Sequence, residues 1–255
     1  SSALTEQVVV DVLASAFDSA GQRCSALRVL CLQDEIADHT LKMLRGAMAE
    51  CRMGNPGRLT TDIGPVIDSE AKANIERHIQ TMRSKGRPVF QAVRENSEDA
   101  REWQSGTFVA PTLIELDDFA ELQKEVFGPV LHVVRYNRNQ LPELIEQINA
   151  SGYGLTLGVH TRIDETIAQV TGSAHVGNLY VNRNMVGAVV GVQPFGGEGL
   201  SGTGPKAGGP LYLYRLLANR PESALAVTLA RQDAKYPVDA QLKAALTQPL
   251  NALRE

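Results

Sequence analysis

The stretch "GQRCS", residues 21–25, places a cysteine in a polar segment that opens with glycine. Cys24 directly follows Arg23, and no apolar run surrounds it. A neighbouring guanidinium and access to solvent favour the nucleophilic thiolate over the thiol. An incidental structural thiol is the alternative for a cysteine considered alone. The residue types in this stretch make Cys24 a candidate nucleophile.

The other cysteines and the histidines give less support to other chemistries. Cys31 lies inside the apolar run "RVLCL" and is expected to be a core residue. Three cysteines without a CxxC pair, and scattered histidines without HExxH, predict reduced thiols and no metal site. A Cys–His hydrolase remains an alternative, with His160 or His175 as the base.

The loop "QPFGGEGLSGTGPKAGG" contains a GxGxxG pattern at Gly197, Gly199 and Gly202. A dinucleotide fingerprint needs a strand before the pattern and a helix that opens after it. Here a proline precedes the pattern and Thr-Gly-Pro follows it. We therefore interpret residues 185–209 as a long ligand-shaping loop.

The segment "KEVFGPV", residues 124–130, places an acid and an aromatic before a strongly apolar run. Glu125 could bind ribose hydroxyls, as carboxylates do in nucleotide sites. The alternative is an exposed acid with Phe127 as an anchoring aromatic at the entrance of a strand.

Helical and strand-like patterns alternate along the chain. Predicted helices cover residues 5–19, 35–50, 69–85, 141–151 and 164–173. Predicted strands cover residues 28–33, 88–93, 129–136, 155–161 and 177–182, with an extended pair over 106–116 broken by Pro111. Gly21 is expected to end the first helix, and Asp68 or Ser69 to cap the third. This alternation predicts an α/β fold with a mostly parallel sheet and helices on both faces.

Composition sets the context for this fold. The chain has 255 residues, of which 43% are hydrophobic and 21% charged, with a net charge of −4. These values are typical of globular proteins and give no reason to expect nucleic acid or an anionic membrane as a partner. No signal peptide or initial Met opens the chain, so we expect a piece of a longer protein. Residues 224–230 are expected to form a strand whose edge is not paired with another strand of this chain, followed by a helix-like tail.

Five separated motifs occur together in one order: "GQRCS", "KEVFGPV", "GYGLTLGVHT", "GNLYVN" and "QPFGG". Over about residues 5–229 the set resembles the catalytic half of the aldehyde dehydrogenase superfamily. The stretch "GAVVGVQPFGGEGLSGTGPKAGGP", together with Ser25, is most similar to the L-glutamate gamma-semialdehyde (pyrroline-5-carboxylate) dehydrogenase branch. Within that branch it resembles the domain found in bifunctional bacterial proline utilization A proteins, which also carry an FAD-dependent proline dehydrogenase.

This resemblance implies a role for seven residues. Cys24 would be the nucleophile, and its backbone N–H would form part of the oxyanion hole. Glu125 would bind the ribose of NAD, and Phe127 would lie beside its nicotinamide. The substrate would be held by the remaining four residues: Ser25, Gly187, Ala188 and Phe195.

The resemblance also implies an organisation. Residues 1–220 would be the nucleophile-bearing catalytic domain, and residues 221–255 a terminal strand and the start of a C-terminal segment. An upstream nucleotide-binding domain of the same parent chain would be a partner, so these residues alone should be nearly inactive. The parent protein is expected to be a homo-oligomer. DNA binding is expected only through parts of the parent outside this chain.

The localisation implied is cytoplasmic, with peripheral attachment to the inner membrane through other parts of the parent left open. FAD is implied only for the proline dehydrogenase domain. Two alternatives remain: an aldehyde dehydrogenase with different specificity, and a structural or assembly module whose thiol is incidental.

Overall fold

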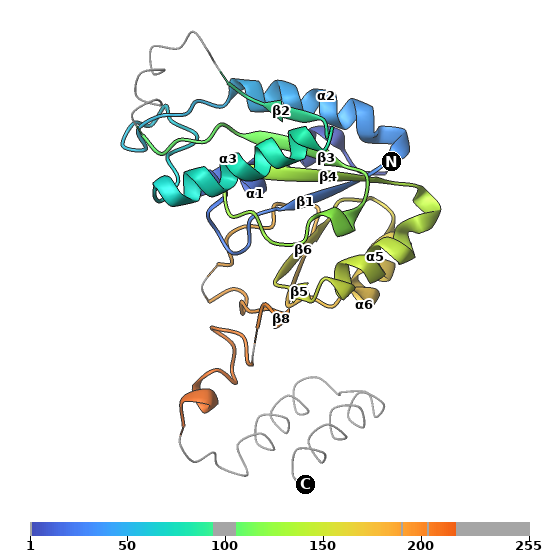
Figure 1. Ribbon diagram of the computed structural model, residues 1–255. Coiled ribbons are helices and arrows are strands. Elements are labelled where there is room, and N and C mark those ends of the chain that lie inside the picture. Colours follow the sequence, from blue (N-terminus) through green and yellow to red (C-terminus); the bar gives the residue numbers. More distant parts are fainter. Residues whose placement is uncertain (1, 94–105, 190, 203, 218–255) are drawn as a thin grey trace. The chain divides into compact units, whose positions relative to one another are not determined.

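The computed structural model describes residues 2–93, 106–189, 191–202 and 204–217 (Figure 1). The chain divides into two compact units, Ser1–Gly209 and Pro210–Glu255. In the second unit, the described part contains a short 3-10 helix, Leu213–Leu216. The strand expected at 224–230 and the tail after it lie outside the described residues.

A four-stranded sheet organises the first unit. Its strands are β1 (Val29–Gln33), β2 (Val89–Gln91), β3 (Thr112–Leu116) and β4 (Val130–Tyr136). Their order is β1-β4-β3-β2. β4 runs parallel to both of its neighbours, and only the pairing of β2 with β3 is antiparallel. The prediction of a mostly parallel sheet is confirmed.

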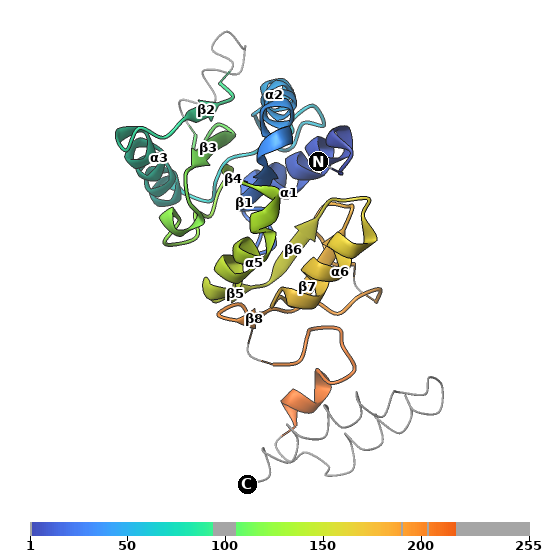
Figure 2. The same ribbon diagram turned by 90° about the vertical axis from the view of Figure 1, so that its right-hand side faces the viewer.

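Helices cover both faces of this sheet, as Figure 2 shows. On one face lie α1 (Thr5–Phe17) and α2 (Asp34–Glu50), and on the other lies α3 (Ser69–Ser84). A parallel sheet buried on both faces requires continuous apolar strands. Residues 130–134 of β4 are all buried, and all but His132 are apolar. Asp68 caps α3 by accepting a hydrogen bond of 2.8 Å from Ala71 N–H.

The rest of the first unit contains two small sheets. β6 (Thr156–Val159) pairs in parallel with β7 (Asn178–Val181), and β5 (Tyr153–Gly154) pairs antiparallel with β8 (Glu198–Gly199). The helices here are α5 (Leu141–Ala150) and α6 (Asp164–Ser173). Neither β5 nor β8 was predicted, because strands of two residues carry no alternation.

The extended pair predicted over 106–116 was wrong in its first half. Only Thr112–Leu116 forms a strand. Thr107 bonds instead to the loop at Val66, with Val66 N–H donating to Thr107 O at 2.9 Å and Thr107 Oγ1 donating to Val66 O at 2.6 Å. Within the described residues, no helix combines the length and the apolar composition needed to cross a membrane.

Candidate active site

Two segments that are distant in sequence meet because β1 and β4 are adjacent parallel strands. Cys24 lies five residues before β1, which begins at Val29, and Glu125 lies five residues before β4, which begins at Val130. Parallel strands begin at the same edge of a sheet. The register pairs Val29 with His132, so the two approach segments lie side by side. The sheet thus brings the candidate nucleophile and the candidate cofactor-binding acid to one edge.

The turn that presents Cys24 is tight. Helix α1 ends at Phe17, and a 3-10 turn, η1 (Asp18–Gly21), follows. Ser19 and Ala20 have φ of 56° and 54°, in the left-handed region. The helix therefore ends earlier than the sequence predicted, and Gly21, at φ 65°, completes the reversal. A Cβ at Gly21 would collide with the carbonyl oxygen of Gly128, so this glycine is required by close packing as well as by its φ.

Backbone bonds hold Cys24 at the surface. Ala26 N–H donates to Arg23 O at 3.0 Å, and Leu27 N–H donates to Ser15 O at 2.8 Å. The first bond closes the turn and the second ties it to α1. Cys24 itself is exposed, and its N–H makes no hydrogen bond to any described residue. An exposed thiol beside a free N–H has the arrangement needed for nucleophilic attack with oxyanion binding.

The other two cysteines differ from Cys24. Burial raises the pKa of the Cys31 thiol to about 12, so Cys31 remains protonated at neutral pH. Cys51 is half-buried, and its Sγ lies 3.7 Å from Ala47 O. Of the three thiols, only that of Cys24 is exposed.

Arg28 joins the Cys24 turn to the Glu125 segment. Its Nη1 donates to Gly21 O at 2.6 Å, and its Nη2 donates to Arg23 O at 3.0 Å. Its Nε donates to Glu125 Oε1 at 2.9 Å. The guanidinium carbon also lies 4.7 Å from the centroid of the Phe127 ring, which is a cation–π distance.

The charge of Arg28 is balanced by the carboxylate of Glu125. Its side chain is 13% exposed. Burial lowers the pKa of Arg28, while the carboxylate of Glu125 and the ionised form of Cys24 act in the opposite direction. Arg28 stands four positions after Cys24, but this spacing alone does not predict its contacts with Glu125 and Phe127.

His132 and His78 form a bonded pair, and His132 contacts the backbone of Arg28. His132 on β4 is fully buried, and its Nδ1 lies 3.1 Å from Arg28 O. Because a carbonyl oxygen only accepts, Nδ1 carries the proton, and Nε2 of neutral His132 accepts from His78 Nε2 at 2.9 Å. Burial, followed by the proximity of His78, lowers the pKa of His132 to about 4. Burial is also the main reason why the pKa of His78 is lowered.

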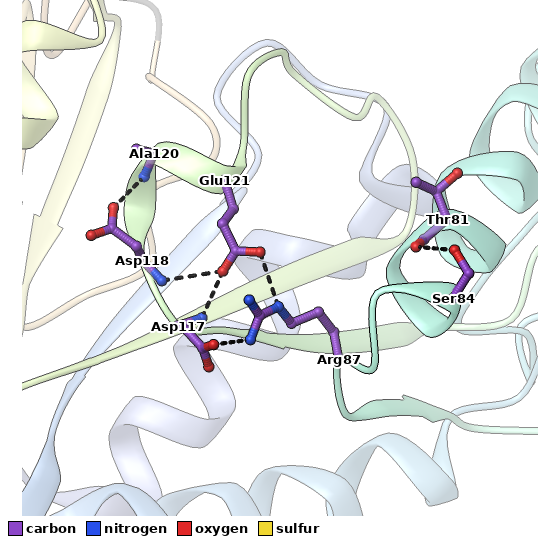
Figure 3. Close-up of polar contacts among 7 residues, drawn as sticks. All are labelled: Thr81, Ser84, Arg87, Asp117, Asp118, Ala120 and Glu121. Atoms are coloured by element: carbon purple, nitrogen blue, oxygen red, sulfur yellow. Dashed lines mark hydrogen bonds and ion pairs between the residues drawn. The ribbon is translucent and has the colours of Figure 1, made fainter.

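The segment that carries Glu125 and Phe127 is anchored upstream by the short turn η2 (Phe119–Glu121). Figure 3 shows Arg87 between Asp117 and Glu121, with ion pairs to both. Glu121 Oε2 accepts from Arg87 Nε at 2.9 Å, and Oε1 accepts from Asp117 N–H at 2.9 Å. These contacts fix the start of the segment that ends at Phe127.

The loop after β7 is tied to the same helix as the Cys24 turn. Met185 N–H donates to Ser15 Oγ at 3.1 Å. Ser15 therefore contacts the Cys24 turn through its carbonyl and this loop through its hydroxyl. Gly187 follows at φ 75° and is exposed, while Ala188 is half-buried. Their N–H groups donate to no described residue, and adjacent free N–H groups can bind an anion.

The Phe195 region is clamped by Asn178 of β7. The side-chain amide of Asn178 donates to Pro194 O at 2.9 Å, and its Oδ1 accepts from Gly196 N–H at 3.2 Å. Phe195 also exchanges two backbone bonds of 2.9 Å with Ala207. These bonds fix the loop around Phe195, and the described residues 204–212, directly after the GxGxxG pattern, contain no helix.

A cavity of about 910 Å³ is lined by Cys24, Arg28, Glu125 and Phe127, among other residues. The structure therefore brings the candidate nucleophile and both candidate cofactor residues to one cavity. Four predicted substrate residues do not line it: Ser25, Gly187, Ala188 and Phe195. Ser25 is only 5% exposed.

The described histidines give no support to a Cys–His pair. His160 Nε2 lies 3.7 Å from Asp11 Oδ2. Where the structure is described, no histidine lies within hydrogen-bonding distance of Cys24. The same described residues contain no group of three or more His, Cys, Asp or Glu side chains able to hold a metal ion.

Comparisons with known proteins identify relatives of this chain. The chain is 90% identical to "Bifunctional protein PutA" of Salmonella typhimurium over all 255 residues, which are 19% of that protein. It is 38% identical to "1-pyrroline-5-carboxylate dehydrogenase 1" of Halalkalibacterium halodurans over 204 residues, which are 79% of this chain and 38% of that protein. The chain thus spans about a fifth of the length of its PutA relatives.

Solved structures give the same picture. A crystal structure of bifunctional proline utilization A (PutA) matches with a TM-score of 0.77 and 52% identity, over 83% of this chain and 21% of that one. A Thermus thermophilus 1-pyrroline-5-carboxylate dehydrogenase matches with a TM-score of 0.73 and 36% identity, over 83% of this chain and 40% of that one. Residues 1–218 also match the profile described as "Aldehyde dehydrogenase family". The chain belongs to the aldehyde dehydrogenase family.

Proposed function

We propose that this chain supplies the nucleophile and part of the cofactor and substrate sites of an NAD-dependent enzyme that oxidises L-glutamate gamma-semialdehyde to glutamate. One observation carries the proposal: exposed Cys24 lies in the same cavity as Glu125 and Phe127, and Arg28 bonds to both segments. The choice of substrate is supported by relatives named 1-pyrroline-5-carboxylate dehydrogenase and PutA.

Cys24 carries out the covalent chemistry. Its thiolate adds to the aldehyde carbon, and the C=O electron pair moves to oxygen to give a hemithioacetal oxyanion. The free N–H of Cys24 stabilises this oxyanion. Loss of hydride from the same carbon leaves a thioester on Cys24. Water then attacks the thioester carbon, which releases the carboxylate and restores the thiolate.

Glu125 and Phe127 fit NAD. The Glu125 side chain is 40% exposed, and a carboxylate there can accept hydrogen bonds from ribose hydroxyls. Phe127 is 46% exposed and offers an apolar ring beside the same cavity. When bound, NAD accepts the hydride lost from the hemithioacetal carbon.

The far end of the substrate carries a carboxylate. We assign its binding to Ser25 and to the free N–H groups of Gly187 and Ala188, with Phe195 beside the aliphatic part. Main-chain binding of an anion requires close approach, which glycine allows. The cavity described above does not include these four residues, so the assignment is a proposal about the complete enzyme.

The domain arrangement follows from this assignment. We assign residues 1–220 to the catalytic domain and 221–255 to a terminal strand and the start of a C-terminal segment. Aldehyde dehydrogenases also use a glutamate as general base and an asparagine that completes the oxyanion hole. We place these two residues and most of the NAD site in parts of the full-length protein outside this chain. We also propose that the parent is a cytoplasmic homo-oligomer with FAD in a proline dehydrogenase domain; the support is that its relatives are named bifunctional PutA proteins.

The test uses the full-length protein that carries this chain. NADH production from glutamate semialdehyde is measured for the wild type, for Cys24→Ala and for Cys51→Ala as a matched control. Loss of at least about a thousandfold in kcat for Cys24→Ala alone is expected, because the covalent step disappears. Full NADH production by Cys24→Ala would show that the thiol is incidental, and semialdehyde turnover without NAD would favour a hydrolase.

A further inference from the structure

Arg28 is the residue through which the two halves of the candidate site touch. Nη1 reaches Gly21 O, Nη2 reaches Arg23 O and Nε reaches Glu125 Oε1, and Nη1 also makes a longer bond of 3.4 Å to Gly128 O. The Gly21 and Arg23 carbonyls belong to the turn immediately before Cys24. The carboxylate belongs to the segment before β4. A single side chain therefore restrains both segments.

Only arginine can make this set of contacts. A guanidinium is planar, and its donors diverge in fixed directions, whereas a lysine ammonium is a single point of charge. The guanidinium face also lies 4.7 Å from the Phe127 centroid, a contact that extends the restraint to the aromatic beside the cavity. The Arg28 side chain is 13% exposed, and its bonds to the Gly21 and Arg23 carbonyls are partly buried, where charge-assisted bonds are stronger. Its ion pair with Glu125 is open to solvent on the Glu125 side.

The backbone of Arg28 is bonded to the neighbouring strand β4. Its carbonyl accepts from the backbone N–H of His132 at 3.0 Å and faces His132 Nδ1 at 3.1 Å. The backbone of Arg28 is thus fixed to β4, the strand that Glu125 and Phe127 precede. The Arg28 partner of the ion pair with Glu125 is therefore fixed at its backbone.

We propose that Arg28 is a positioning residue that couples the Cys24 nucleophile to the NAD-binding acid. The inference rests on the proposed function, since it takes Glu125 as the ribose-binding group. Arg28 Nε donates a hydrogen bond to Glu125 Oε1, and no described residue bonds Oε2. One carboxylate oxygen is therefore held by the protein while the other remains for the ribose. The same guanidinium bonds the carbonyls of Gly21 and Arg23, which directly precede Cys24, so NAD binding and the placement of the thiol depend on one side chain.

The first experiment measures NAD affinity by calorimetry on the full-length protein, with no aldehyde present. Arg28→Met and Glu125→Gln should each weaken NAD binding about tenfold, since a small misplacement of a binding group is costly. The double variant should bind no more weakly than the weaker single variant, because Arg28 acts through Glu125. Losses that multiply in the double variant, or wild-type affinity in Arg28→Met, would overturn the proposal.

The second experiment measures the rate at which iodoacetamide alkylates Cys24. Arg28→Met should slow alkylation about tenfold. Arg28→Lys should recover part of the rate, because it restores the positive charge but not the diverging donors of the guanidinium. Equal rates in all three proteins would contradict coupling to the nucleophile. If Arg28→Met does not fold, the cycle is repeated with Arg28→Lys and Glu125→Gln, for which the same non-additivity is expected.

The matched control is Arg135→Met. Arg135 makes ion pairs with Asp38 and Glu115, away from the Cys24 turn. This variant loses a comparable set of arginine contacts, so it should keep the NAD affinity and the alkylation rate of the wild type. Neither readout requires glutamate semialdehyde. If the wild type fails to oxidise that substrate, the proposed function fails while the role of Arg28 is still decided.

Discussion

His132 contacts Arg28 through one shared acceptor: the backbone N–H and the ring Nδ1 of His132 both lie about 3 Å from Arg28 O. The ring is fully buried, and burial lowers the pKa of His132 to about 4. The ordinary histidine pKa is about 6.5. In the unfolded chain, His132 therefore binds a proton at a pH where the folded protein excludes it.

This difference gives a pH-dependent stability. The contribution of neutral His132 is complete above pH 6.5 and is lost as the pH falls from 6.5 towards about 4, because the unfolded state alone gains the proton. The loss over that window amounts to about 3 kcal/mol. His132→Phe should flatten the dependence. Hydrogen exchange of β4 amides, corrected for intrinsic rates, measures it in the full-length protein.

The control for this prediction is His39→Gln, which removes an exposed histidine from α2. It should leave the exchange of β4 unchanged between pH 6.5 and 4. A His132→Phe protein whose β4 opening keeps the wild-type pH dependence would contradict the role given to His132.

The three cysteines should react at different rates with iodoacetamide at neutral pH. Cys24 is exposed, whereas burial raises the pKa of Cys31 to about 12 and removes its thiolate. We expect Cys24 to be alkylated first, Cys51 more slowly and Cys31 last. Peptide mass spectrometry after short exposure measures the order. Equal labelling of Cys24 and Cys51 would count against an activated thiol.

The elements of the sheet and most of the helices were predictable from local patterns. β4 is mostly apolar over residues 130–134, and α3 begins after a capping aspartate, so both can be recognised within a few residues. Cys24 and Glu125 were predicted as site residues from their local sequence and the family resemblance, and their roles remain predictions. Short pairings such as β5 with β8 depend on glycines that are distant in sequence and could not be predicted.

The role of Arg28 lay beyond sequence reasoning for a different reason. Its contacts with Glu125 and Phe127 exist only because β1 and β4 are paired in one register. The histidine pair likewise requires α3 to pack against β4, which brings together residues 54 positions apart. Interactions of this kind follow from packing between elements, and no single element carries a pattern for them.

Glycine can be required by a positive φ or by close packing, and Gly21 and Gly86 allow the two effects to be compared. Both have positive φ, of 65° and 75°, but a Cβ at Gly21 would collide with Gly128 O, whereas one at Gly86 meets no described atom within 4 Å. Gly86→Ala should cost about 1 kcal/mol of stability through backbone strain alone. Gly21→Ala should cost more and should also lower kcat, because the collision displaces the Cys24 turn. Thermal unfolding and NADH production measure the two effects, and equal losses in both variants would contradict the close-packing argument.

Glu121 should matter more than Asp117 for the segment that leads to Glu125. Its carboxylate bonds both Arg87 and the N–H groups at the start of η2, and its side chain is 18% exposed, compared with 78% for Asp117. Glu121→Ala should release the turn and raise the KM for NAD several-fold, while Asp117→Ala should leave it near the wild-type value. Steady-state kinetics with varied NAD distinguishes the two. A larger effect in Asp117→Ala would show that the exposed ion pair anchors the segment.

Ala188 tests the assignment of the substrate carboxylate. A bulky side chain in Ala188→Leu should obstruct approach to the free N–H groups of Gly187 and Ala188, which a substrate with a distal carboxylate needs and a simple aliphatic aldehyde does not. The KM for glutamate semialdehyde should therefore rise about tenfold or more, with a smaller change for an aliphatic aldehyde of similar length. Val192→Leu, at an exposed position on the same loop, is the matched control and should change neither KM. If Ala188→Leu affects both aldehydes alike, the loop only shapes the cavity, and the carboxylate must be bound elsewhere.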